Sequence, residues 1–286
     1  MTRNHLIRCV LTAVAMLSVV TVTSSTAAPQ QKSDEELRRK MASLAWQRGP
    51  TEGRIGGLAT IKVPEGQLFL DSANTRRFLE LNDNPPRDNR YALVANDLSW
   101  FAVFFFEETG YVKDDEKLDP DKLLKALQNA DGASNVERKR LGMGTLYTDG
   151  WHVMPHYDPA TRRLEWGARL RTDSGQYVVN YSIRLLSRRG VMHVVLVSGP
   201  DELNHDINVF KTSLASYNFV PGERYSEFRS GDRVAEFGLA ALVLGGAAAV
   251  AVKSGAGKGL LKILVYGGIA LVGGVATFVR KLVRRS

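Results

Sequence analysis

The chain has 286 residues and a formal net charge of +8, from 38 Lys and Arg against 30 Asp and Glu. Nine of the basic residues lie in residues 1–27 and 237–286, which contain no acids, so residues 28–236 hold 29 bases against 30 acids and are nearly neutral. A nucleic-acid-binding protein needs a basic patch on its folded part. The charge therefore argues against a nucleic-acid partner, and basic flanks on apolar runs are typical of membrane topology.

Residues 1–27 are predicted to be a secretory signal peptide. Arg3 and Arg8 precede an apolar run over residues 9–22, and Ser25-Thr26-Ala27 provides a small-residue cleavage site. An uncleaved N-terminal anchor is the alternative, although the run is short for a membrane span. The single cysteine, Cys9, lies in this leader. The mature chain therefore has no disulfide, no catalytic thiolate and no cysteine-ligated metal.

Residues 28–232 are predicted to form an exported α+β domain with a largely antiparallel sheet. A capping box of Ser33 and Glu36 begins a helix that ends at Gly49-Pro50. Two strands, 57–63 and 67–70, are predicted to pair as a hairpin. A helix capped by Ser72 or Asn74 follows, and then strands 91–95 and 100–106, of which the second is apolar on both sides and expected to be central.

The second half of this domain is predicted to be a meander between helices. An acidic loop leads to a helix from Asp119-Pro120, and a separate short helix is expected from Ser134 to Gly142. Four strands with turn residues between them then follow, at 151–157, 164–171, 177–186 and 191–197. The last elements are a helix from Pro200, whose expected buried residues are Leu203, Ile207, Phe210 and Leu214, a short strand over 218–220, and a polar link over 222–232.

Residues 233–286 are predicted to be a transmembrane anchor with a basic tail. Its apolar runs, 237–252 and 263–279, are each close to the length of a span. Two spans would leave the tail outside, against the positive-inside bias, whereas one span would place the tail inside. Small residues at spacings of four favour close helix packing in a hairpin or a homo-oligomer; they are Ala241, Gly245, Ala249, Ala270 and Gly274.

Several stretches resemble a bacterial family of membrane-anchored proteins known as a domain of unknown function. They are Val63-Pro64-Glu65-Gly66 with Phe69-Leu70, Gly110 to Asp115, Val179-Asn180-Tyr181 with Arg184-Leu185-Leu186, Gly222-Glu223-Arg224-Tyr225, and Gly231-Asp232. The resemblance implies an exported domain with a C-terminal anchor and implies no reaction. Residues 151–220 also resemble PsbP-like α/β folds, a likeness of fold that carries no function.

Candidate catalytic residues are few. His152 and His156 lie about 13 Å apart on an ideal strand, which is too far for one metal ion. The carboxylates Glu107, Glu108, Asp114, Asp115 and Glu116 lack the spacing of an EF-hand and are predicted to be a solvated loop. Residues 254–259 imitate part of a phosphate loop but lack its first Gly and its Ser or Thr. No cofactor is expected.

The sequence favours a non-enzymatic protein of the bacterial inner membrane whose domain lies in the periplasm. Its partners would be the membrane and an inner-membrane or periplasmic protein. The predicted docking residues lie beside the anchor and combine aromatic rings with charge; they are Arg224, Tyr225, Glu227, Phe228 and Arg229. An uncharacterised hydrolase or metal-dependent enzyme using the acidic loop and His152 or His156 is the alternative, and a small-ligand carrier is a third hypothesis.

Overall fold

The computed structural model describes residues 29–82, 84, 86–140 and 142–245. The predicted signal peptide and most of the predicted anchor lie outside these residues. Residues up to Arg39 belong to one unit, which contains most of helix α1 (Pro29–Ala42), and a second compact unit begins at Lys40. The first helix therefore ends before the predicted Gly49-Pro50, and strand β1 (Gln47–Arg48) follows it.

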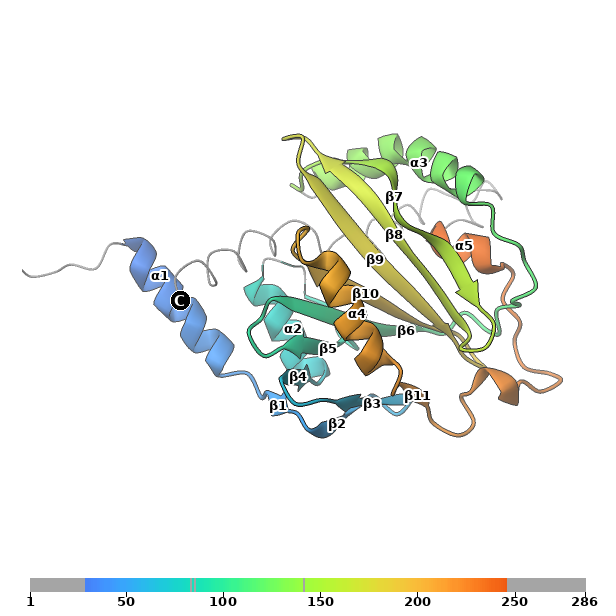
Figure 1. Ribbon diagram of the computed structural model, residues 1–286, viewed down its shortest axis with the longest axis horizontal. Helices are drawn as coiled ribbons and strands as arrows, with labels where there is room; N and C mark the ends of the chain where they lie inside the picture. The colour runs from blue at the N-terminus through green and yellow to red at the C-terminus, as the bar shows by residue number, and fades with distance from the viewer. Residues whose placement is uncertain (1–28, 83, 85, 141, 246–286) are drawn as a thin grey trace, which may run out of the picture. The chain divides into compact units, whose positions relative to one another are not determined.

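The described residues contain one eight-stranded sheet, with the strand order β1-β4-β5-β6-β10-β9-β8-β7 (Figure 1). All of its pairings are antiparallel. Its further strands are β4 (Gln67–Leu70), β5 (Tyr91–Ala95), β6 (Trp100–Glu107), β7 (Leu146–Asp158), β8 (Arg163–Thr172), β9 (Tyr177–Leu186) and β10 (Val191–Ser198). The predicted meander is confirmed. In addition, β10 pairs with β6, which is buried from Trp100 to Phe104 and is central, as predicted.

A second, three-stranded sheet corrects the predicted hairpin. In the described chain β3 (Ala59–Val63) pairs with β2 (Thr51–Ile55) and β11 (Asn218–Phe219), whereas β4 pairs with β1 and β5. The alternation of residues 57–63 identified a strand but could not identify its partner. Gly53 on β2 lies against the ring of Phe69, where a Cβ would come within 2.6 Å of a ring carbon, so the two sheets pack closely at this glycine.

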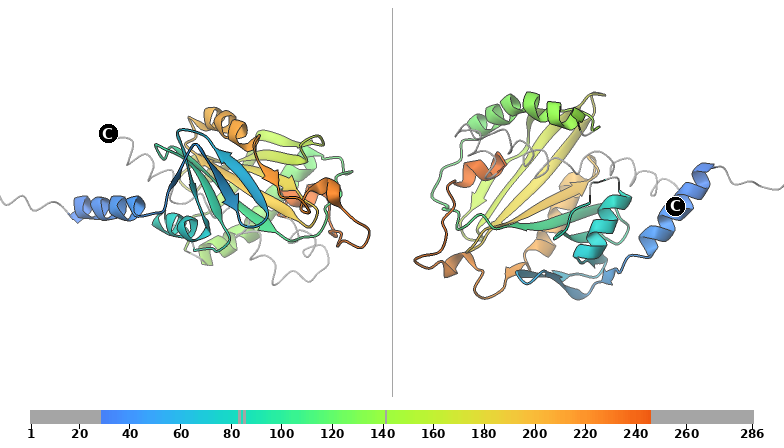
Figure 2. Two further views of the ribbon diagram at one scale, coloured as in Figure 1. Left: turned by 90° about the horizontal axis from the view of Figure 1, so that it is seen from below. Right: turned by 180° about the vertical axis from the view of Figure 1, so that it is seen from behind.

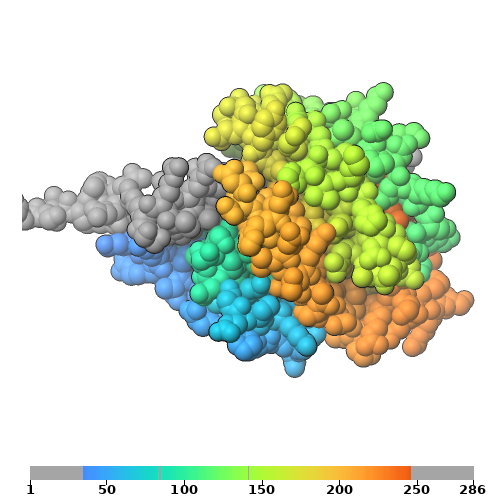
Figure 3. Space-filling model, in the orientation of Figure 1, coloured from blue at the N-terminus to red at the C-terminus, as the bar shows by residue number. Residues whose placement is uncertain are grey.

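The first face of the large sheet is covered by the small sheet and by helix α4 (Leu203–Leu214), which lies across the strands in Figure 1. The four helix residues predicted to be buried are all in this core. Phe210 packs edge-on against Trp100 and Phe104 at ring centroid distances of 5.9 and 6.2 Å. Beside α4, the outer ends of β8 and β9 form open surface (Figure 3).

The second face carries helices α2, α3 and α5, as seen from behind in Figure 2. Helix α2 (Ser72–Leu81) is capped by Asp71, not by the predicted Ser72 or Asn74, and packs Phe78 against Phe101. Helix α3 (Pro120–Arg140) and the short helix α5 (Leu239–Val243) add apolar residues to a second core around Trp166.

Helix α3 is one continuous helix of 21 residues, not the two predicted. Its side chains bond the free edge of β7 at two points one helical turn apart. Asn135 pairs with both backbone groups of Leu146 at 2.8 and 2.9 Å, and Asp131 accepts the N–H of Thr148 at 2.6 Å. These bonds occupy edge groups that could otherwise pair with another chain, and they lie on either side of the start predicted for the second helix at Ser134.

We expect the double substitution Asp131→Ala and Asn135→Ala to lower the free energy of unfolding by about 2–4 kcal/mol, at roughly 1 kcal/mol per lost hydrogen bond. It should also produce concentration-dependent association through the exposed β7 edge, measured by sedimentation velocity. Asn129→Ala, at an exposed position of the same helix, is the matched control. If the double variant stayed as monodisperse as this control, edge protection by α3 would be disproved.

The start of the predicted anchor is part of the fold. Leu239, Leu242 and Val243 are buried in the second core, and in the part of the chain that the structure describes no helix has the length and apolar character to cross a membrane. Ala241 lies in α5 and Gly245 follows it with φ +110°. The other predicted helix-packing residues, Ala249, Ala270 and Gly274, lie outside the described residues.

Candidate functional site

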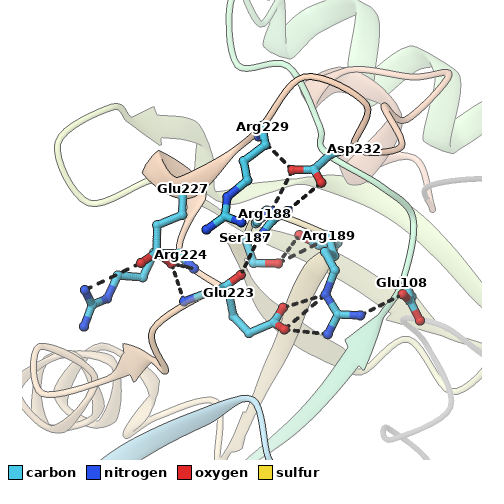
Figure 4. Close-up of polar contacts among 11 residues, drawn as sticks. Glu108, Ser187, Arg188, Arg189, Glu223, Arg224, Glu227, Arg229 and Asp232 are labelled. Carbon is cyan, nitrogen blue, oxygen red and sulfur yellow. Dashed lines mark hydrogen bonds and ion pairs between the residues drawn. The ribbon is translucent and has the colours of Figure 1, made fainter.

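The predicted polar link over residues 222–232 is bonded to the turn between β9 and β10 (Figure 4). Arg188 of this turn donates from Nε and Nη2 to the two carboxylate oxygens of Asp232, at 2.6 and 2.7 Å. Arg189 binds Glu223 at 2.5 Å and Glu108 at 3.1 Å. The bonds from Arg188 lower the pKa of Asp232 to about 2, so this ion pair persists throughout the neutral range.

The link also bonds to itself. Glu227 accepts the backbone N–H groups of Gly222 and Arg224 at 2.7 and 2.9 Å, which closes a short 3-10 turn over Tyr225–Glu227. Asp232 accepts the N–H of Arg229 at 2.8 Å. Because the carboxylates satisfy backbone donors that a loop would leave free, the link has a defined conformation.

Tyr225 connects this link to the acidic loop. Its ring is 7% exposed and stacks on Tyr111, with centroids 4.4 Å apart. Its hydroxyl donates to the carbonyl of Val112 or to Asp114, each at 2.9 Å. The guanidinium of Arg162 lies 5.0 Å above the ring and also pairs with Asp114. We call Tyr111, Asp114, Tyr157, Arg162 and Tyr225 the tyrosine hub.

Asp114 is the acceptor at the centre of the tyrosine hub. Burial alone would raise its pKa, but hydrogen bonds from Tyr157 and Tyr225 and the charge of Arg162 outweigh burial and lower it. Burial and the neighbouring carboxylate raise the pKa of Tyr157. At neutral pH the tyrosine hub therefore contains an ionised Asp114, a cationic Arg162 and a neutral Tyr157, and these groups bond one another to support the structure.

The backbone joins the same segments. Tyr111 pairs with Val234 in a parallel bridge, through its N–H to the carbonyl of Arg233 and its carbonyl to the N–H of Ala235, at 2.8 and 2.9 Å. Gly110 precedes this bridge with φ +91°, and a Cβ there would lie 2.8 Å from the carbonyl oxygen of Arg233. Only glycine fits both the conformation and the contact.

The five predicted docking residues divide into two groups. Tyr225 is a core residue and Glu227 is bonded to the backbone, so neither ring nor carboxylate is free for a partner. Arg224, Phe228 and Arg229 are exposed. Phe228 keeps 38% of its surface accessible although its ring lies 4.3 Å from that of Tyr111. We call Arg224, Phe228 and Arg229 the link surface; the segment that carries it lies at the molecular surface in Figure 3.

The residues of the predicted enzymatic alternative do not converge. His152 and His156 are both exposed on β7, where His152 Nε2 lies 2.9 Å from Asn204. In the described part of the chain no three His, Cys, Asp or Glu side chains are grouped as metal ligands would be. The acidic loop is not merely solvated: Glu108 pairs with Arg189, Asp114 belongs to the tyrosine hub, and Glu116 accepts the N–H of Ala240 at 3.0 Å.

A family model described as "Protein of unknown function (DUF2167)" matches residues 47–276, most of the chain. The chain belongs to the DUF2167 family. Curated proteins gave no match. Among solved structures, the chain is similar to the solution structure of cyanobacterial PsbP (CyanoP) from Synechocystis sp. PCC 6803, at 11% identity and a TM-score of 0.34, covering 56% of this chain and 86% of that one.

The stretches that carried the resemblance largely meet in this DUF2167 structure. Residues 110–115 and 222–225 form the tyrosine hub and its link, and Asp232 is the partner of Arg188. Val63-Pro64-Glu65-Gly66 lies elsewhere, at the turn between the two sheets. The resemblance identified these stretches in the sequence, and the structure shows that their side chains form hydrogen bonds and ion pairs with one another.

A buried polar cluster was missed by the sequence reasoning. Arg184 of β9, His193 of β10 and Phe105 of β6 stand side by side on the second face of the sheet. His193 stacks on Phe105 with centroids 4.5 Å apart, and Glu107 Oε2 lies 3.0 Å from its Nε2. The available signal was a single basic residue in each of two strands that contain no acid. Arg90 lies over the ring of Phe105 at 3.7 Å. We call Arg184, His193, Glu107 and Arg90 the sheet cluster.

Proposed function

We propose that this DUF2167 chain is a membrane-anchored protein of the bacterial envelope that binds a protein partner through the link surface at the inner membrane. Residues 1–27 would export the domain, and the apolar runs after it would anchor it. The observation that carries the proposal is the combination of a bonded link with exposed Arg224, Phe228 and Arg229. The link surface lies shortly before the first apolar run, which begins at residue 237.

The chemistry of the link surface supports protein recognition. Arginine and aromatic side chains are enriched at the energetic centres of interfaces. Their backbone is already ordered by Asp232 and Glu227, so binding would not have to order it, and less conformational entropy would be lost on association. The partner should offer carboxylates for the two guanidinium groups and an apolar contact for Phe228.

The test is native mass spectrometry of the full-length protein extracted from its own membrane in mild detergent. We expect a stoichiometric protein partner with the wild type, and a loss of affinity of about tenfold or more in the triple variant Arg224→Ala, Phe228→Ala, Arg229→Ala. These side chains are exposed, so the fold should remain intact.

The matched control replaces two arginines and one aromatic ring on a different surface. Arg169→Ala, Arg171→Ala and Tyr177→Ala lie at the open outer end of β8 and β9, where Tyr177 is 50% exposed. The partner should remain bound to this control. Absence of any partner from the wild type, or equal loss in both triple variants, would contradict the proposal.

A further inference from the structure

The sheet cluster lies at the centre of the protein's main sheet. Arg184 and His193 are direct cross-strand neighbours, and His193 is in turn opposite Phe105. Arg184 also lies over the ring of Trp166 at 4.7 Å, and Arg90 lies over Phe105 at 3.7 Å. Aromatic rings therefore surround two guanidinium groups and one imidazole on the second face of the sheet.

The sheet cluster carries more positive than negative charge. Arg184 is 4% exposed and His193 is 5% exposed, whereas the Glu107 side chain is 34% exposed. Burial lowers the pKa of Arg184 to about 9 and that of Arg90 to about 10, so both are cations at neutral pH. Glu107, whose pKa is lowered, supplies a single negative charge. Burial of uncompensated charge is unfavourable.

The cluster also has unused hydrogen-bonding groups. Arg184 Nε has no partner among the described residues, and its Nη1 donates only to the carbonyl of the adjacent Ile183, at 3.0 Å. His193 Nδ1 also has no hydrogen-bond partner there, whereas His193 Nε2 lies 3.0 Å from Glu107 Oε2. Buried polar groups in folded proteins are nearly always bonded, so orphaned donors point to a missing acceptor.

Among the described residues, Glu107 is the one carboxylate whose charge acts on Arg184, Arg90 and His193. Glu107 faces His193 and gives Arg184 Nε no hydrogen bond. An acceptor from another molecule would neutralise Arg184 and take its Nε hydrogen.

We propose that Arg184 and His193 bind a small oxyanion, a carboxylate or a phosphate group, on the second face of the sheet. Arg184 donates from Nε, and the ring of His193, whose single N–H faces Glu107 from Nε2, lines the site beside it. Glu107, at the solvent side, orients the imidazole, while Phe105 and Trp166 keep the site apolar and so strengthen the charge-assisted bonds. This site is separate from the link surface and does not depend on the proposed partner.

The test uses full-length protein with isotope-labelled histidine, titrated with inorganic phosphate and, separately, with succinate at constant ionic strength. The His193 ring signals are identified by their absence from the His193→Gln variant. We expect them to shift saturably with one of the two anions. A lack of saturable shift with both anions would overturn the proposal.

Variants then assign the binding to the cluster. Arg184→Lys keeps the charge but loses the Nε donor, and Arg184→Met loses both, so we expect affinity to fall by about tenfold or more in each. Arg171→Gln, an exposed arginine on β8, is the matched control and should retain wild-type affinity. If Arg184→Met fails to fold, Arg184→Lys decides. Wild-type affinity in a folded Arg184 variant would overturn the assignment.

Discussion

Replacing Tyr225 by alanine is expected to lower the free energy of unfolding by about 3–5 kcal/mol, the usual cost of deleting a large buried aromatic side chain. The variant loses the stack on Tyr111 and the hydroxyl bonds to Val112 and Asp114. It also leaves Arg162 without its ring contact. Urea unfolding of the full-length chain, followed by tryptophan fluorescence, measures the change.

Tyr225→Phe separates the ring from the hydroxyl. It keeps the stack and loses only the hydrogen bonds, so a cost of about 1–2 kcal/mol is expected. In Tyr225→Ala the link should also become susceptible to trypsin at Arg224, Arg229 and Arg233, because local opening exposes the backbone. Two results would contradict this role of Tyr225 in fixing the link. One is that Tyr225→Ala lowers the free energy of unfolding no more than Tyr225→Phe does; the other is that trypsin cleaves both variants equally slowly.

The second large effect is a loss of stability in mild acid caused by His193. Burial, and then the charge of Arg184, lowers the pKa of His193 from 6.5 to about 4. Above pH 6.5 the imidazole is neutral in both folded and unfolded chains and contributes no pH dependence. Between pH 6.5 and 4 the unfolded chain binds a proton that the folded chain does not. The expected loss over this window is about 3 kcal/mol.

His193→Gln is the variant that isolates this titration. It should remove most of the slope of unfolding free energy against pH between 6.5 and 4, whatever its effect on stability at pH 7. Arg184 and Arg90 stay charged over this range, while Glu107, whose pKa is lowered, adds to the loss near its lower end. His205→Gln, which replaces another histidine in the same way, is the control. Equal slopes in wild type and His193→Gln would show that His193 does not titrate as inferred.

Local patterns predicted the elements better than their pairings. The strands of the meander were recoverable because turn residues separate alternating or apolar runs, as between β9 and β10. Strand β2 was missed because its sequence, Thr51-Glu52-Gly53-Arg54-Ile55, is mostly polar and contains a glycine. The structure shows why glycine is needed there: the ring of Phe69 leaves no room for a Cβ at Gly53. Helix α3 was divided at Ser134, which imitates a helix cap, and the bonds from Asp131 and Asn135 to β7 are long-range and leave no periodic signal in the sequence.

The candidate site was located only in part for the same reason. The link was named from its aromatic and charged residues, but Tyr225 was treated as exposed. Its burial depends on Tyr111 and Asp114, more than a hundred residues earlier. Arg184 was named only as part of a stretch that resembles the family, and His193 was not named. Each is the single basic residue of its strand, and only the register between β9 and β10 makes them neighbours.

The bridge between Tyr111 and Val234 has a mechanical consequence. Residues 233–245 are bonded to the loop after β6 and packed through Leu239 and Leu242 into the second core. The end of the described chain is therefore fixed to the domain and does not form a flexible linker. A pull or twist applied beyond Gly245 would be passed through Tyr111 and Asp232 to β6 and to the turn that joins β9 and β10. Load at that end would reach the central strands of the sheet directly.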